Sequence, residues 1–402
     1  MPEYRSMRVR LHRTILVLAS AHFLIDCYSS MYGAFLPFLY QERGLSLGQA
    51  GILGGALAFS SALTQPLYGY LADRFRSRVF LVVGPGLAAI FISSLGLAPN
   101  FSFLLPMVML AGVGIAAFHP QGAGLTSQLS DGRRGFYMSV FISAGMAGYA
   151  LGPVFITTII ILAGLHNSYW AALPGVAMSL YLAVRGPSPP SQRRVRHRRL
   201  FARLRRNRKP LFLLYMLVVV RASIQMSFVA FLPLYLTTRG YSPVEGSQML
   251  ALFLAVGGTA GFLGGLLADS FGGRGLITVS MLGCCPLLLG FLWTEGWISI
   301  LLCLAGSAFL LSTAPVNVVL AQQLVPEGVA TVSAFLMGFA WGVGGLLIPG
   351  VGFLSEGIGL QMALSGIALL GVPGILMAMA LPARIGRAQL AEETSIESQP
   401  AG

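Results

Sequence analysis

The five residues Gly69–Asp73, which read Gly-Tyr-Leu-Ala-Asp, recur as Gly265–Asp269, which read Gly-Leu-Leu-Ala-Asp. The same offset of 196 residues relates other pairs in the two halves of the chain: Leu36-Pro37 and Leu232-Pro233, Gly44 and Gly240, Ser46 and Ser242, Pro153 and Pro349. One offset along so much of the chain indicates a duplicated structural unit. In a membrane protein, such a duplication is typical of a transporter whose site lies between the repeats.

The composition is that of an integral membrane protein. Apolar residues make up 55% of the chain, charged residues only 10%, and the mean hydropathy is +0.77. Runs of about 20 apolar residues are long enough to cross a bilayer as helices. The sequence therefore predicts an all-α membrane protein with twelve spans in two pseudo-symmetric six-helix bundles: 14–40, 48–72, 79–97, 102–129, 134–162, 168–185, 211–238, 243–270, 275–294, 297–322, 329–354 and 359–381.

The positive charges predict how the chain crosses the membrane. The net charge is +13, and 23 of the 26 Lys and Arg residues fall on one side of the predicted spans. Under the positive-inside rule, both termini are cytoplasmic, here at a bacterial inner membrane. The boundaries are an N-terminal bundle over 1–185, a basic linker over 186–210 and a C-terminal bundle over 211–402. The linker can be an RNA-binding patch, but a topology-fixing segment beside anionic lipids is favoured, with no nucleic-acid partner.

A charged loop follows the second span of each half. An acidic residue at a helix C-terminus is disfavoured by the helix dipole, so we expect a bridging basic partner that holds the cytoplasmic side shut. The alternative is an ordinary charged loop. The residues expected to form this cytoplasmic gate are Gly69, Asp73, Arg74 and Arg78 in the first half and Gly265, Asp269 and Arg274 in the second.

Small residues recur along the fifth span, at Gly145, Gly148 and Gly152, and Pro153 follows them. This spacing lets two helices meet backbone to backbone, while the proline bends the helix. Simple helix packing and a role in antiport are both open interpretations.

Ionisable residues lie at mid-membrane depth, where they are costly and usually face a cavity. At 1.5 Å per residue, Asp26 is about 18 Å and Arg221 about 15 Å from the cytoplasmic start of their spans; His119 lies about 10 residues into the fourth span from the same side. His22 shares a helix face with Asp26, as Gln225 does with Arg221.

We expect Asp26, His22 and His119 to carry a coupling proton, and Arg221 and Gln225 to bind an anionic or zwitterionic substrate. The structural alternative is an Asp26–Arg221 ion pair that only packs two helices, with both histidines as core residues.

Taken together, the loop signature and the duplication resemble the Major Facilitator Superfamily over essentially the whole chain. Two departures stand out, since Arg76 occupies a usual glycine position of the loop and Ser270 a usual arginine position. The resemblance implies a secondary transporter that works by alternating access, with helices 1, 4 and 7 lining the cavity. The Gly-Pro run of the fifth span looks like the motif associated with proton-coupled exporters.

A narrower resemblance, confined to the first half, is to the fosmidomycin-resistance branch of this superfamily. It rests on His22, Asp26 and Tyr28 in span 1, on Phe118-His119-Pro120 in span 4 and on the glycine run. Where that branch commonly has Glu, this chain has Gln121, which cannot release a proton, so Asp26 is the favoured coupling residue. The duplication pairs Gln121 with Asn317; with Tyr28, both are expected to contact substrate.

The expected function is proton-coupled export of a small drug-like or anionic organic molecule: an efflux antiporter conferring drug resistance. The proton gradient supplies the energy, without a cofactor or metal, and the protein is expected to be a monomer. Metabolite uptake or exchange and lipid flipping are alternatives within the same fold. A polytopic enzyme or a non-transporting sensor is disfavoured, because the spans show no nucleophile motif, paired carboxylates or metal-ligand cluster.

Overall fold

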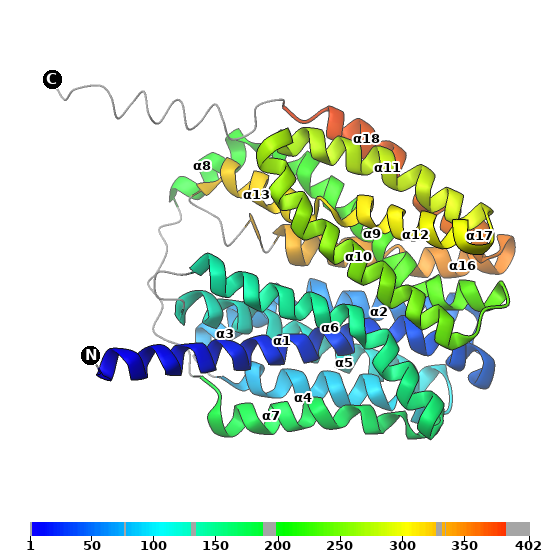
Figure 1. The fold of residues 1–402 in the computed structure, drawn as a ribbon, viewed down its shortest axis with the longest axis horizontal. Coiled ribbons are helices and arrows are strands. Elements are labelled where there is room, and N and C mark those ends of the chain that lie inside the picture. The colour runs from blue at the N-terminus through cyan, green and yellow to red at the C-terminus, as the bar shows by residue number, and fades with distance from the viewer. Residues whose placement is uncertain are drawn as a thin grey trace. The chain divides into compact units, whose positions relative to one another are not determined.

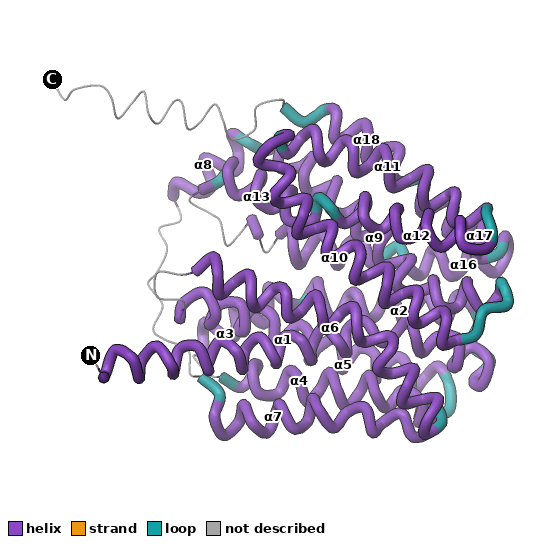
Figure 2. Tube along the Cα trace, viewed as in Figure 1, coloured by secondary structure: helices purple, strands orange, loops and turns teal. Residues whose placement is uncertain are grey.

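The computed structural model describes residues 2–75, 78–129, 134–187, 198–326, 332–333 and 335–382, and side chains within 12–72, 78–129, 136–187, 202–268, 272–326, 332–333 and 335–382. Within these ranges every regular element is a helix, which confirms the predicted all-α membrane fold (Figure 2).

The first half, coloured blue to green in Figure 1, contains the long helices that carry the histidine and glycine motifs. Its elements are α1 (Pro2–Arg43), α2 (Leu47–Ala58), the π-helical η1 (Phe59–Leu63), α3 (Gln65–Phe75), α4 (Val79–Ser93), the 3-10 helix η2 (Ser94–Leu97), α5 (Phe101–Leu129), α6 (Arg134–Ala163), the 3-10 helix η3 (Leu165–Ala172) and α7 (Leu173–Arg185).

The second half follows the short basic helix α8 (Arg198–Arg206). Its elements are α9 (Arg208–Thr238), α10 (Pro243–Phe271), α11 (Gly273–Trp293), α12 (Gly296–Leu311), α13 (Ala314–Leu324), the π-helical η5 (Phe335–Phe339), α15 (Ala340–Gly345), α16 (Ile348–Ile358), α17 (Leu360–Ala368) and α18 (Gly371–Met379).

Eleven of the twelve predicted spans correspond to described helices that are long and apolar enough to cross a membrane. The predicted span 168–185 does not meet that standard. It begins in the 3-10 helix η3 and continues as α7, an α-helix of only 13 residues.

The repeat reappears in the turns that join the first two helices of each half. Gly44 follows α1 with φ 61° and Gly240 follows α9 with φ 89°, a left-handed conformation that glycine adopts without strain and that ends a helix. The next helix then starts with a capping box, in which a serine hydroxyl and the side chain three residues later bond each other's backbone N–H. The pairs are Ser46 with Gln49 and Ser242 with Glu245.

Packing divides the chain into two compact units, and their boundaries do not coincide with the boundary between the two repeats. The first unit comprises Met1–Arg193, Gln225–Ala255 and Gly345–Ile367, and the second comprises Arg194–Ile224, Val256–Gly344 and Ala368–Gly402. In the first, α1 lies along α6, and α4 packs between α5 and α7 (Figure 1). In the second, α11 packs against α12 and α18. The division into domains at 185 and 211 remains a prediction from the repeat.

Segments of the second half join the first unit because small residues let backbones touch. A Cβ at Gly33 would overlap the carbonyl of Val229, and one at Gly352 would overlap that of Leu47. One at Gly55 would lie 2.5 Å from the Pro349 ring. These contacts lie towards the end of the bundle at which α1 ends and α2 begins, named here the α1–α2 end.

Candidate proton site

Three of the predicted residues meet in the first unit. Asp26 Oδ1 is 3.0 Å from His119 Nε2, and Asp26 Oδ2 is 3.3 Å from His22 Nε2. His22 and Asp26 are four residues apart on α1 and therefore share one face of that helix, while His119 comes from α5. The two imidazole rings meet edge to face, with centroids 5.2 Å apart.

The main chain and an aromatic ring hold the histidines in place. His22 Nδ1 lies 2.7 Å from the carbonyl oxygen of Phe141, and His119 Nδ1 lies 2.8 Å from that of Ile115. The His22 ring also stacks on Phe141, with centroids 4.0 Å apart and planes 13° from parallel. Both rings therefore present Nε2 to the carboxylate.

These contacts determine where protons must be. A carbonyl oxygen only accepts hydrogen bonds, so Nδ1 of each histidine carries a proton, and a neutral ring then has an unprotonated Nε2. An unprotonated Nε2 cannot bond to an ionised carboxylate. The 3.0 Å contact between His119 and Asp26 is therefore satisfied only when a proton lies on one of the two groups. The cluster is neutral with that proton and negatively charged without it.

The three side chains are largely sheltered. The side chain of His22 is 9% exposed, that of Asp26 19% and that of His119 23%. A charge held in such sheltered surroundings interacts strongly with its neighbours.

The glycines of α6 make room for this cluster and for α1. A Cβ at Gly145 would lie 2.5 Å from Asp26 Oδ2. Further along the same face, a Cβ at Gly148 would overlap the main-chain oxygen of Phe23, and one at Gly152 would overlap that of Cys27. The glycine run is thus the surface on which α1 rests. Pro153 lies within α6.

Two predicted substrate residues are engaged in helix packing. The fully buried Tyr28 hydroxyl donates a hydrogen bond to Ala171 O and accepts one from Gly175 N–H, both at 2.9 Å. The Gln121 side-chain carbonyl accepts from Leu81 N–H at 2.6 Å, in the first turn of α4. Such partners give both side chains a structural role, which the sequence did not indicate.

The remaining predicted substrate residues are buried. Arg221 is 1% exposed, and its guanidinium carbon lies 5.3 Å from the centre of the Trp341 ring in the second unit. Asn317, also 1% exposed, has a side-chain oxygen without a hydrogen-bond partner within the described part of the chain. Gln225 is buried in the first unit.

The basic residues of the predicted gate bond to helix ends within their own half. Arg78 donates to the carbonyl oxygens of Gly186 and Ala183 at 2.8 and 2.9 Å, at the end of α7. Its repeat partner Arg274 donates to Met379 O at 2.6 Å, at the end of α18. A cation there satisfies free carbonyls and complements the helix dipole.

The glycines of the gate motif occupy equivalent places too, since Gly69 faces Pro120 and Gly265 faces Pro315. The side chains of Asp73, Arg74 and Asp269 lie outside the described residues, so the gate stays a prediction there.

We expect Arg78→Gln and Arg274→Gln each to lower the free energy of unfolding by about 1 kcal/mol, because each leaves helix-end carbonyls without a charged donor. Thermal unfolding in detergent measures this, with the exposed Arg13→Gln as control. Unfolding temperatures equal to that of Arg13→Gln would show that the two caps do not stabilise the fold.

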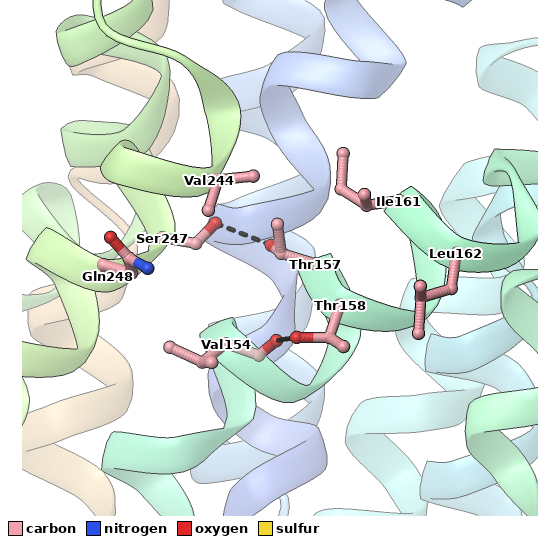
Figure 3. Close-up of a pocket in the computed structure, with 8 residues that line it drawn as sticks. All are labelled: Val154, Thr157, Thr158, Ile161, Leu162, Val244, Ser247 and Gln248. Atoms are coloured by element: carbon pink, nitrogen blue, oxygen red, sulfur yellow. Dashed lines mark hydrogen bonds between the residues drawn. The ribbon is translucent and has the colours of Figure 1, made fainter.

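Contacts at the α1–α2 end were not predicted. Glu356 of α16 accepts a hydrogen bond from Gly48 N–H at 2.8 Å, in the first turn of α2. Thr157 of α6 and Ser247 of α10 share a buried hydrogen bond of 2.7 Å (Figure 3). The duplicated capping serines mark this end in the sequence, but they do not indicate which helices meet there.

A crevice of about 160 Å³ lies beside the Thr157–Ser247 bond (Figure 3). Its lining contains no charged side chain, so it lacks the chemistry of the His22–Asp26–His119 cluster. The lining residues are Val154, Thr157, Thr158, Ile161 and Leu162 of α6 and Val244, Ser247 and Gln248 of α10.

Comparison with known proteins agrees with this architecture. The sequence model of the Major Facilitator Superfamily matches residues 18–349. An uncharacterized MFS-type transporter of Bacillus subtilis, YfnC, is 28% identical over 373 residues, covering 90% of this chain and 91% of the relative. The fosmidomycin resistance protein of Escherichia coli is 27% identical over 370 residues, covering 89% and 90%.

Among solved structures, a bacterial homolog of the human lysosomal transporter Spinster, in an inward-facing and occupied conformation, superposes with a TM-score of 0.73. It covers 97% of this chain and 99% of its own, at 18% sequence identity. At that identity the likeness supports the fold alone.

Proposed function

Since this chain belongs to the Major Facilitator Superfamily and is a multi-pass membrane transporter rather than an enzyme, we propose that it exports a small drug-like or anionic organic molecule in exchange for protons. Transport proceeds by alternating access, the proton gradient supplies the energy, and no cofactor takes part.

The His22–Asp26–His119 cluster is the observation that carries the proposal. It satisfies its 3.0 Å contact only when protonated, and losing that proton leaves a negative charge in a sheltered site. Such a charge favours whichever conformation admits water or a cationic partner. Proton uptake and release are thereby linked to the conformation of α1 and α5.

Export is favoured over uptake by the relative that confers fosmidomycin resistance, since pumping an antibiotic out of the cell produces resistance. Arg221, with Gln225 one helical turn further along α9, supplies the group for an anionic or zwitterionic substrate. A buried guanidinium recognises carboxylate or phosphonate oxygens through two parallel hydrogen bonds.

We place both termini in the cytoplasm of a bacterial inner membrane, on the distribution of Lys and Arg. The α1–α2 end is then periplasmic. Packing of Gly33, Gly55 and Gly352 against the other half closes that end in the first unit, as an inward-facing transporter requires. We expect a monomer, with anionic lipids beside the basic linker.

Purified protein in liposomes tests the proposal. We expect fosmidomycin, or another member of a panel of anionic and drug-like compounds, to drive proton movement reported by an internal pH dye. An imposed proton gradient should in turn drive accumulation of the same compound. Transport that is indifferent to the gradient would contradict proton coupling, and lipid movement without solute transport would favour a flippase.

A further inference from the structure

We propose that His22, Asp26 and His119 also bind one divalent transition-metal ion, with Zn²⁺ the best match, in competition with protons. Metal binding stands on the geometry of the cluster, whereas the inhibition of transport that follows from it rests on the proposed function. From the sequence we expected no metal-ligand cluster. Spacing along one helix brings together only His22 and Asp26, and the third ligand, His119, comes from another helix.

The donor atoms have the required separation. The three residues each offer a ligand atom, and these atoms lie within 4.8 Å of one another. Two ligands about 2.1 Å from Zn²⁺ at a tetrahedral angle are about 3.4 Å apart. The Asp26 oxygens lie 3.0 and 3.3 Å from the two Nε2 atoms, close to that separation.

The surroundings match those of metal-binding histidines. Such a histidine almost always donates its second ring N–H to a carbonyl or carboxylate, which fixes the tautomer and points the free nitrogen at the metal. Both rings here have that arrangement, through Phe141 O and Ile115 O. A side chain at Gly145 would collide with His22 and Asp26, so glycine at this position lets α6 approach the three ligands without displacing them.

The chemistry of the donors selects the metal. Two imidazole nitrogens and one carboxylate suit Zn²⁺ and its neighbours in the first transition row, whereas Mg²⁺ and Ca²⁺ prefer oxygen ligands alone. Three protein ligands leave a fourth position for water or an anion. With an ionised Asp26 and two neutral histidines, the bound site carries one positive charge.

Competition follows from the shared atoms. A metal ion needs the Nε2 lone pairs and an ionised carboxylate, so binding releases any proton held between Asp26 and the histidines. A metal-loaded site cannot take up the coupling proton, and Zn²⁺ is therefore expected to stop proton-driven transport.

Calorimetric titration of the purified, chelator-treated protein with Zn²⁺ tests the site. We expect one ion per chain, bound at least tenfold more weakly at a pH of about 6 than of about 8, since protons compete for the ligands. His119→Gln and Asp26→Asn should each weaken binding by about 10-fold or more. The exposed His166→Gln on η3 is the matched control and should bind as the wild type does.

Folding of each variant is checked by thermal unfolding without metal, and added Zn²⁺ should raise the unfolding temperature only where the site is intact. Equal affinity in wild type and His119→Gln, or no binding at about 100 times the concentration of protein, would overturn the metal site. If the protein binds no Zn²⁺ but still carries out proton-coupled transport in the presence of chelator, the metal site is wrong and the proposed function stands. If the protein binds Zn²⁺ but shows no proton-coupled transport, the metal site stands and the proposed function is wrong.

Discussion

Replacing Gly148 with Ala is expected to lower the free energy of unfolding by about 3 kcal/mol, because an added methyl group in a close helix contact can be accommodated only by moving the helices apart. The added Cβ would overlap the main-chain oxygen of Phe23. A side chain can rotate away, but a backbone atom moves only with its helix, so α1 and α6 must separate. Thermal unfolding in detergent and the yield of monodisperse protein measure the loss.

The matched control is Gly124→Ala on α5, where nothing lies within 4 Å of the new Cβ. Alanine is a better helix former than glycine by about 1 kcal/mol, so this variant should be at least as stable as the wild type. Equal stability of the two variants would show that the glycine run of α6 is not a close-packing surface.

Asp26→Asn is expected to abolish proton-driven accumulation while leaving downhill exchange of substrate. The amide is nearly isosteric with the carboxyl group and can donate to an unprotonated Nε2. It neither gains nor loses a proton, so the cluster can no longer carry the negative charge that the carboxylate leaves when its proton is released. Transport in liposomes, with and without an imposed proton gradient, separates the two activities.

Glu42→Gln is the control for this substitution, since Glu42 is an exposed acid on the same helix. It should transport as the wild type does. Gradient-driven accumulation by Asp26→Asn at the wild-type rate would remove Asp26 from the coupling mechanism. A parallel loss of exchange and of folded protein would instead indicate that Asp26 only holds α1 against α5.

Much of the fold could be predicted from the sequence. An apolar stretch in a bilayer must satisfy its backbone internally, so composition and length alone predict helices. The repeat predicted equivalent turns, which the structure shows at Gly44 and Gly240. Helix periodicity placed His22 and Asp26 on one face, and counting residues along each span placed His119 at a similar depth.

Apolar composition, the repeat and helix periodicity do not indicate which helices are neighbours or how each helix is rotated about its axis. Periodicity within one helix is unchanged when the helix turns towards a different partner. The sequence therefore could not show that Tyr28 and Gln121, predicted to contact substrate, bond to η3, α7 and α4. Nor could it show that Arg78 and Arg274, predicted as gate residues, each bond to the end of the last helix of their half. Their substrate and gate roles stay predictions.

The sequence by itself determined the membrane-helical class, the duplication and the spacing of the ionisable residues along their helices, because these follow from composition and from position along the chain. Only the tertiary structure decided that α5 brings His119 to Asp26, that the glycines of α6 face α1 and that Glu356 meets the start of α2. These contacts join residues far apart in the chain, and they depend on how several helices pack at once, which no local pattern records.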